Sequence, residues 1–421
     1  MNIKTNINQI VHSRNFRHGM LYTLFSFINR GLGFVLVLIL ARYLNPSDYG
    51  SLNLFNTFVT LLNIFISLCT TDYVTVSFFK TSKETLSKII LIALATTTII
   101  LTLMSLLLTS GETFFERIVG IKIQYLWIGL FICYFQVFFN LNLDIWRLEE
   151  RPISYGIFSF LLAVANFALT FFLIVGMQKG WEGRVYAQVW TSITFFFLSL
   201  FFLIRRNYIV ISLPNKSLIK DTLVYALPLI PHTMSFWLKQ GIDRYIINYF
   251  YDQAAVGFFS FAMNLAAIIT IIGQAFNATN SVYIYKKLAE GYEKARGVLN
   301  KQTKIMTAVF LIVSIGVGLF AFGLIHFFLL RYNESIQYIL PLCLGAFFQC
   351  LYLLWVNYLF YYKKTRQLMH ITLSTALLQV LLSLWLTPYS IMCTAFVSTS
   401  IILITMMLVR YRAKKLLKYQ M

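Results

Sequence analysis

The sequence predicts an all-α membrane protein with about twelve transmembrane helices in two six-helix lobes around a central cavity. Three observations lead to this fold class. Of the 421 residues, 59% are hydrophobic and only 12% are charged, whereas about a quarter of the residues of a soluble domain are charged. The mean hydropathy is +0.73. Apolar runs of about 20 residues, the length of a helix that crosses a bilayer, recur along the whole chain.

The apolar runs place twelve spans separated by short loops. We expect them near residues 16–40, 51–72, 88–109, 123–143, 153–176, 184–204, 222–250, 255–276, 303–329, 337–360, 368–387 and 389–409. Six spans fall in each half, which predicts an N-terminal lobe over residues 1–210 and a C-terminal lobe over residues 211–421. The first run is long enough to stay in the membrane as a span.

Loop charge predicts the orientation of the spans. With the N-terminus in the cytoplasm, most of the 35 lysines and arginines fall in cytoplasmic loops and termini, and the opposite side holds only Arg42, Arg117, Lys122, Lys179, Arg184 and Arg331. Cytoplasmic loops of membrane proteins carry an excess of these residues, so both termini are expected in the cytoplasm. The net charge of +20 then reflects loops that face anionic membrane lipid, and we expect no nucleic-acid partner.

The longest polar stretch between spans, Lys286–Lys304, is strongly basic. Two interpretations remain open for it. It can form an amphipathic helix on the cytoplasmic surface of the membrane, or it can be a solvated connector.

A weak internal repeat relates the two halves. The segment from Arg42 to Leu52 aligns with the segment from Tyr249 to Phe259 so that Gly50 matches Gly257. Parallel repeats of six spans imply two lobes related by an axis along the membrane normal, with a cavity between them.

The seventh predicted span carries ionisable side chains among residues that suit lipid. Ionised groups at membrane depth cost several kcal/mol each unless they face protein, water or a charged ligand. His232, Ser235, Lys239 and Asp243 share one helix face, because they are three or four residues apart. We predict that this face, together with Arg244, contributes to a cationic cavity that binds a polyanionic lipid head group.

Two prolines, Pro228 and Pro231, stand one turn apart at the entrance to this span. Proline removes a backbone hydrogen bond, and broken helices are typical of the moving elements that line transporter cavities. We predict a hinge at this pair.

Arg30 lies in the middle of the first span, on one face with Thr23, Ser26 and Gly33. It precedes Gly50 by nearly the spacing at which Lys239 precedes Gly257. Two cations at similar depth, one from each lobe, would form a receptor for a pyrophosphate.

Each of these cations also has a structural interpretation. Arg30 can be tied to a carboxylate such as Asp72 or Asp144. Lys239 can pair with Asp243 at the i+4 position. Arg244 can brace the turn that follows the span.

Uncharged polar stripes follow two other spans. One consists of Asn53, Asn56, Thr60, Asn63 and Ser67, and the other of Gln136, Asn140 and Asp144. Such side chains either join helices or line a water-filled path. We assign Asn56, Thr60, Asn63, Gln136 and Asn140 to the lining of a hydrophilic cavity.

The sequence shows no pattern of an enzyme or a metal site. It has no P-loop, no HExxH motif and no Ser/His/Asp arrangement. The five cysteines lie in apolar runs without metal-ligand spacing. We therefore expect a transporter without cofactor or bound metal.

Several segments resemble a known family. Arg42-Tyr-Leu-x-Pro-x-Asp-Tyr-Gly50-x-Leu52 resembles the first-loop signature of bacterial polysaccharide exporters of the Wzx O-antigen flippase type. The seventh-helix signature of that family resembles Leu227-Pro-Leu-Ile-Pro231, Trp237, Asp243-Arg244 and Val256-Gly257. The resemblance covers nearly the whole chain. Arg30-Gly-Leu-Gly-Phe34 also resembles the first-helix motif of the lipid II flippase, in which the matching arginine faces the cavity.

The resemblance implies a member of the multidrug/oligosaccharidyl-lipid/polysaccharide (MOP) exporter superfamily, which alternates between inward- and outward-open states. It implies a flippase in the bacterial inner membrane for undecaprenyl-diphosphate-linked oligosaccharide, destined for O antigen in lipopolysaccharide biosynthesis or for capsule. Membrane lipid, a polysaccharide polymerase and a chain-length regulator are the other implied partners.

Three alternatives remain. A cation-coupled multidrug exporter of the same superfamily would need an acidic residue in the first span, which instead carries Arg30. An integral-membrane polysaccharide polymerase or glycosyltransferase would need a long periplasmic loop or a cytosolic catalytic motif. A membrane scaffold without transport would tolerate neutral residues at Arg30 and Lys239.

Overall fold

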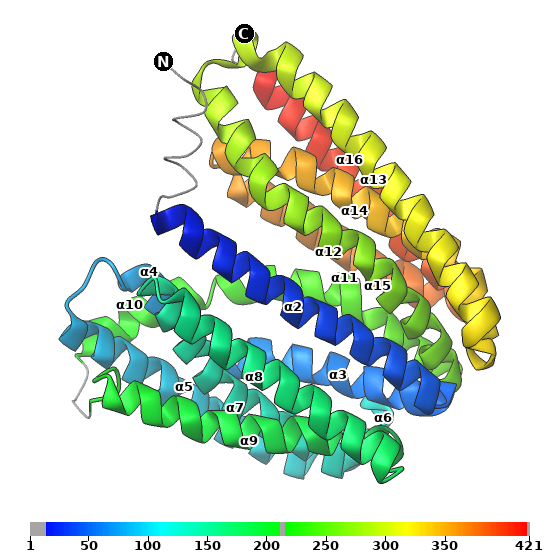
Figure 1. The fold of residues 1–421 in the computed structure, drawn as a ribbon, viewed down its shortest axis with the longest axis horizontal. Coiled ribbons are helices and arrows are strands. Elements are labelled where there is room, and N and C mark those ends of the chain that lie inside the picture. The colour runs from blue at the N-terminus through cyan, green and yellow to red at the C-terminus, as the bar shows by residue number, and fades with distance from the viewer. Residues whose placement is uncertain (1–13, 211–214, 419–421) are drawn as a thin grey trace. The chain divides into compact units, whose positions relative to one another are not determined.

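The computed structural model describes residues 14–210 and 215–418, and every regular element within these ranges is a helix (Figure 1). Eleven of the described helices are long and apolar enough to cross a membrane. The predicted all-α membrane fold is therefore confirmed. The predicted cytoplasmic ends of the chain, residues 1–13 and 419–421, lie outside the described residues.

The chain divides into two compact units. Unit 1 comprises residues up to Leu44 together with Phe55–Ile230, and unit 2 comprises Asn45–Leu54 together with Pro231 and the residues after it. One division falls inside a single helix, α3 (Pro46–Ser67), between Leu54 and Phe55. The other falls at the predicted hinge, between Ile230 and Pro231.

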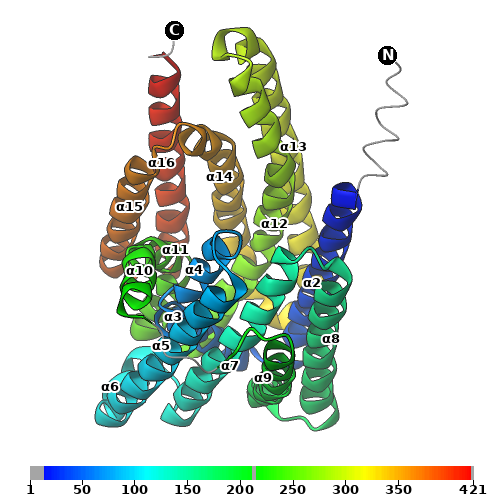
Figure 2. The ribbon, with the colours of Figure 1, turned by 90° about the vertical axis from the view of Figure 1, so that its left-hand side faces the viewer.

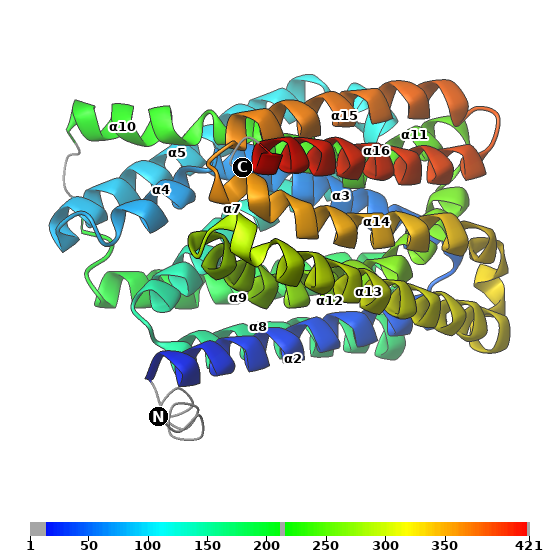
Figure 3. The ribbon, with the colours of Figure 1, turned by 90° about the horizontal axis from the view of Figure 1, so that it is seen from above.

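Unit 1 is a helical bundle in which α2 packs along α8 (Figure 3). Helix α7 contacts α5, α8 and α9. A buried aromatic cluster of Phe139 and Trp146 from α7, Phe158 from α8 and Phe195 from α9 joins these three helices. Besides the second part of α3, its elements are α2 (Arg14–Tyr43), α4 (Thr70–Ser77), α5 (Lys83–Ser110), α6 (Glu112–Val119), α7 (Ile123–Leu148), α8 (Pro152–Phe171), the π-helix η1 (Phe172–Gly176), α9 (Gly180–Arg205) and α10 (Lys216–Ala226).

Unit 2 is built around α14, which packs against α12, α13 and α16 (Figure 2). A second hydrophobic cluster joins one end of these helices and includes Leu288, Leu299, Leu359 and Val409. Besides the first part of α3, its elements are α11 (Leu229–Phe250), α12 (Gln253–Ala289), α13 (Tyr292–Phe328), the 3-10 helix η2 (Leu330–Ser335), α14 (Ile336–Tyr361), α15 (Thr365–Leu386) and α16 (Ile391–Lys418).

The seventh predicted span, 222–250, is not one helix. Helix α10 ends at Ala226, and α11 begins at Leu229. Pro228 lies in the break, whereas Pro231 lies in the first turn of α11, where its missing N–H leaves no hydrogen bond unmade. Because α11 has 22 residues, it is about 33 Å long and can cross a bilayer, but its ionisable residues exclude it from the eleven apolar helices.

The basic stretch Lys286–Lys304 is neither a separate surface helix nor an irregular connector. Its first residues end α12, and residues from Tyr292 onward begin α13, with a turn at Gly291. Each of these helices has 37 residues, so each is about 55 Å long and exceeds the thickness of a hydrocarbon core of about 30 Å. The polar stretch therefore continues two membrane helices.

Candidate binding pocket in unit 2

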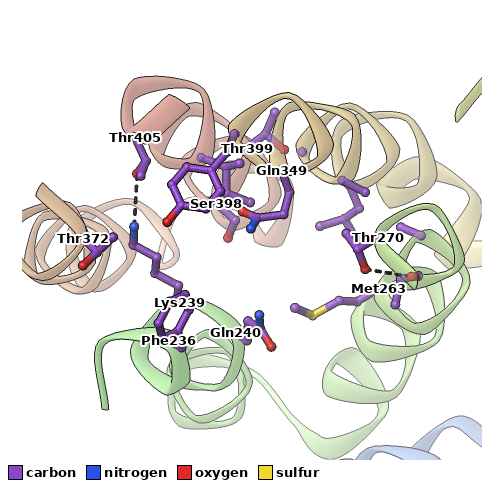
Figure 4. A pocket seen from close by; sticks show the side chains of 17 residues that line it. Phe236, Lys239, Gln240, Met263, Thr270, Gln349, Thr372, Ser398, Thr399 and Thr405 are labelled. Atoms are coloured by element: carbon purple, nitrogen blue, oxygen red, sulfur yellow. Dashed lines mark hydrogen bonds between the residues drawn. The ribbon is translucent and has the colours of Figure 1, made fainter. Parts of the chain in front are cut away.

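Unit 2 contains a pocket among α11, α12, α14, α15 and α16 (Figure 4). Its empty volume is about 930 Å³, part of which is open to solvent. The wall combines apolar side chains with polar groups from each of these helices, including Lys239, Gln240, Gln349, Thr372, Ser398 and Thr405. A largely apolar cavity with a few polar groups aimed into it is the usual form of a ligand site.

Lys239 supplies the positive charge of this pocket. Its Nζ donates to Thr375 Oγ1 at 2.8 Å and to Thr405 Oγ1 at 3.1 Å. An ammonium group has three donors, and these two bonds use two of them. Among the described residues no carboxylate forms an ion pair with Lys239, so the structure does not contain the alternative pairing with Asp243. The half-buried ammonium therefore has one N–H left for a ligand.

Asp243 is satisfied by protein groups and does not line the pocket. Its side chain is buried, with 2% of the residue exposed. The carboxylate accepts hydrogen bonds from Gln379 Nε2 at 2.9 Å, Ser383 Oγ at 2.9 Å and Ser398 Oγ at 2.5 Å. Since these donors belong to α15 and α16, Asp243 ties α11 to both helices.

Arg244 and His232 also lie away from the pocket lining. Arg244 Nε donates to Ser260 Oγ of α12 at 3.0 Å, and its Nη1 donates to the carbonyl oxygen of Gln240 at 2.7 Å. Arg244 thus braces α11 against α12. The ring of His232 packs edge-on against Phe236, with 5.1 Å between ring centroids. Of the seventh-span residues predicted to bind substrate, only Lys239 lines this pocket.

Arg30 is exposed on α2 within unit 1, as are Thr23 and Gly33 of the same predicted stripe. The described residues contain no ion pair between Arg30 and either Asp72 or Asp144, and Asp144 instead pairs with Arg147 at 2.8 Å. The proposed tie to a neighbouring carboxylate is therefore not present. The guanidinium is exposed, and its role in substrate binding stays a prediction.

The predicted polar stripes contribute contacts between helices of unit 1. Asn63 Nδ2 donates to Gln136 Oε1 at 2.8 Å, which joins α3 to α7. Asn56 Oδ1 accepts from Gln188 Nε2 at 3.1 Å, which joins α3 to α9. Thr60 and Asn140 are exposed, and their role as cavity-lining residues stays a prediction.

Sequence reasoning missed the two partners of Lys239, Thr375 and Thr405, and the pocket residue Gln349. These residues come from the last three helices, in which the sequence indicated only apolar spans. One sequence signal was present, since Thr394, Ser398 and Thr405 recur at helical spacing on one face of α16. A polar stripe of this kind indicates a helix that faces polar groups of its neighbours.

Comparison with known proteins shows the family of this chain. The family model described as "Polysaccharide biosynthesis protein" matches residues 16–283, more than half of the chain. The chain belongs to this family. The matched region includes Arg30, the predicted hinge and Lys239.

Two proteins of Haemophilus influenzae are similar along most of their length. A protein of the Lsg locus is 25% identical over 361 residues, which cover 83% of this chain and 86% of that protein. A second protein, described as an uncharacterized membrane protein, is 25% identical over 341 residues, which cover 80% of this chain and 81% of that protein.

Solved structures of the MOP superfamily share the fold. An inward-facing multidrug resistance MATE family transporter has a TM-score of 0.77 at 16% identity, covering 92% of this chain and 94% of that chain. The lipid II flippase MurJ in an inward closed conformation has a TM-score of 0.75 at 14% identity, covering 94% and 87%. The predicted membership in a polysaccharide biosynthesis family is therefore confirmed, and the predicted fold is shared with these structures. The protein is a multi-pass membrane protein of a polysaccharide biosynthesis family.

Proposed function

We propose that this protein is a flippase that moves undecaprenyl-diphosphate-linked oligosaccharide units, for O antigen or capsule, from the cytoplasmic to the periplasmic leaflet of the bacterial inner membrane. The observation that carries the proposal is the ammonium of Lys239, which faces a membrane-embedded pocket without a carboxylate partner among the described residues. An uncompensated cation at this depth is costly unless it binds an anion. Membership in a polysaccharide biosynthesis family makes a lipid diphosphate the fitting anion.

In this mechanism Lys239 and Arg30 each bind the diphosphate while the lipid tail stays in the bilayer. Lys239 offers a point charge with one unused N–H, and Arg30 offers an exposed guanidinium that can bind phosphate oxygens in pairs. Neutralising the head group locally lowers the cost of carrying it across the hydrocarbon core. The break around Pro228 would bend as the protein alternates between inward- and outward-open states.

The proposal also covers the orientation of the protein in the membrane, its partners and the residues behind the pocket. Both termini lie in the cytoplasm, as the loop charges favour. A polysaccharide polymerase and a chain-length regulator use the flipped product on the periplasmic side. Arg244, Asp243 and His232 act by shaping α11 behind the pocket.

A cation-coupled multidrug exporter is less compatible with these residues. Helix α2 contains no aspartate or glutamate between Arg14 and Tyr43, and the pocket of unit 2 presents Lys239. A cationic drug would be repelled by this ammonium rather than attracted to it.

Complementation of a flippase-deficient strain that makes the matching polysaccharide tests the proposal. The variants are Lys239→Met and Arg30→Met, which keep much of the side-chain length and remove the charge. Lys301→Met removes an exposed cation of α13 and serves as the matched control. Membrane expression is verified for each variant, and lipid-linked intermediates are assayed on each leaflet.

We expect wild type and Lys301→Met to restore surface polymer, and the other two variants to trap intermediates on the cytoplasmic side. Full export by well-expressed Lys239→Met and Arg30→Met would remove the diphosphate contact from the proposal. Failure of the wild-type chain to restore export in the matched host would contradict the flippase function itself.

A further inference from the structure

The pocket of unit 2 contains two primary amides, Gln240 and Gln349, whose side chains have no hydrogen-bond partner among the described residues. Figure 4 shows both amides pointing into the space between α11, α14 and α16. Elsewhere in unit 2, amides are used to join helices. Asn264 Nδ2 donates to Tyr49 Oη at 2.8 Å, and Asn357 Nδ2 donates to Asn277 Oδ1 at 2.8 Å. Gln240 and Gln349 form no such bond between helices, so their amide groups can bind a ligand.

The pocket hydroxyls cannot take over this donor role. Thr270 Oγ1 donates to the carbonyl oxygen of Ala267, Thr372 Oγ1 to that of Met369, and Thr399 Oγ1 to that of Pro341, at 2.8, 3.1 and 2.6 Å. Each hydroxyl has one proton, so these three can only accept from a ligand. The hydrogens offered to a ligand come from the remaining N–H of Lys239, from the two amides and from the phenol of Tyr352, which also lines the pocket.

The donors differ in charge. Lys239 carries one positive charge, whereas Gln240 and Gln349 each present a neutral donor and a neutral acceptor. Such amides can both donate to and accept from the hydroxyl or acetamido groups of a sugar. With a phosphate they form only neutral hydrogen bonds, without the attraction between opposite charges that Lys239 provides. Phe236, Met263 and Ile402 add apolar wall against which the C–H face of a sugar ring can pack.

We infer that Gln240 and Gln349 are specificity-determining residues that read the sugar attached to the lipid diphosphate, while Lys239 holds the neighbouring phosphoryl group. This inference rests on the proposed flippase function and extends it, because it assigns the saccharide contact to named side chains. A sugar that cannot satisfy both amides forfeits these hydrogen bonds. It also leaves the half-buried Gln349 without a partner in the pocket, which disfavours its binding.

Binding measurements on the full chain in lipid nanodiscs test the assignment. The probes are undecaprenyl diphosphate without sugar and the same lipid carrying glucose, galactose or N-acetylglucosamine. The variants are Gln240→Leu and Gln349→Leu. Gln274→Leu changes an exposed amide of α12 that lies outside the pocket lining and is the matched control, and Lys239→Met reports on the charge.

We expect the wild type and Gln274→Leu to bind at least one sugar-bearing lipid about ten-fold or more tightly than the bare lipid. Gln240→Leu and Gln349→Leu should lose that preference and keep the affinity for the bare lipid. Lys239→Met should weaken binding of all four lipids.

The outcomes separate this inference from the function on which it rests. A wild-type protein that binds the bare lipid but prefers none of the three sugar-bearing lipids overturns the inference, as does an amide variant that keeps the wild-type preference. A wild-type protein that binds neither bare nor sugar-bearing lipid overturns the proposed function as well.

Discussion

Gly50 and Gly257 lie against each other where α3 crosses α12 in unit 2. A Cβ atom on Gly50 would lie 1.8 Å from the carbonyl oxygen of Gln253, and one on Gly257 would lie 1.9 Å from the carbonyl oxygen of Pro46. Backbone atoms cannot rotate away as a side chain can, so only glycine fits at either position. These are the two glycines that the internal repeat aligned. The repeat therefore marks a contact in which two helices approach at backbone distance.

Gly50→Ala and Gly257→Ala should each force the two helices apart. We expect each variant to lower the free energy of unfolding by about 1–3 kcal/mol or more, the usual cost of overpacking. Thermal unfolding of the purified protein in detergent measures the effect. Gly316→Ala is the matched control, because nothing lies within 4 Å of the Cβ it would add to α13. Equal unfolding temperatures for all three variants would show that α3 and α12 can move apart at little cost in stability.

Asn63 and Gln136 should be energetically coupled, since they join α3 to α7 at 2.8 Å. Asn63→Leu and Gln136→Leu each leave one amide unpaired, whereas the double variant removes both groups. A double-mutant cycle of chemical unfolding should therefore give a coupling energy of about 0.5–1.5 kcal/mol. The exposed pair Thr60 and Asn140 provides a control cycle in which the effects add. A coupling energy near zero for Asn63 and Gln136 would show that the amides act independently.

Tyr208 should stabilise unit 1 by an amount that decreases at high pH. It follows α9 and donates a hydrogen bond to Glu149, which follows α7 and also pairs with Arg206. Burial raises the pKa of Tyr208, and the hydrogen bond to Glu149 raises this pKa further. Because the folded protein holds the phenolic proton more tightly than the unfolded chain, the stabilisation is complete below about pH 10 and declines above it.

Tyr208→Phe should therefore cost about 1–2 kcal/mol at pH 7, and the stability difference from wild type should shrink as the pH rises above about 10. Thermal unfolding between pH 7 and pH 11 measures this difference. Tyr411→Phe, at a tyrosine that is 62% exposed, corrects for the general effect of alkali. A difference that stays constant up to pH 11 would contradict the assigned hydrogen bond.

Hydropathy alone predicted most of the fold, because a membrane helix must be apolar over about 20 residues whatever it packs against. The same measure misplaced the ends of α12 and α13, since a hydropathy pattern stops where charges begin while the helices continue. It also joined α10 to α11, although Pro228 had been identified as a break. Local apolar content cannot distinguish one kinked span from two helices.

Only the pocket residues of a single helix could be predicted from the sequence, because helical spacing shows which residues of that helix share a face. Helical spacing placed Lys239 and Asp243 on one face, and the structure shows Lys239 at the pocket and Asp243 bonded behind it to Ser383 and Ser398. Arg244 points toward α12 instead, because one residue further along a helix turns the side chain by about 100°. Gln349 could not be assigned, since its place depends on long-range packing of α14 against α12 and α16.

Thr375 and Thr405 should position the ammonium of Lys239 for its ligand. Thr405 Oγ1 lies 3.0 Å from Thr375 Oγ1, and each hydroxyl accepts from Lys239 Nζ. Thr375→Val and Thr405→Val keep the side-chain shape and remove these acceptors. The ammonium then loses a partner and its fixed direction, so we expect each variant to bind undecaprenyl diphosphate about ten-fold more weakly. Thr387→Val, which breaks the buried contact with Thr394 at 2.7 Å, is the control for a general loss of packing. If this control weakens binding as much as the other two variants, the threonines act through stability and not through the position of Lys239.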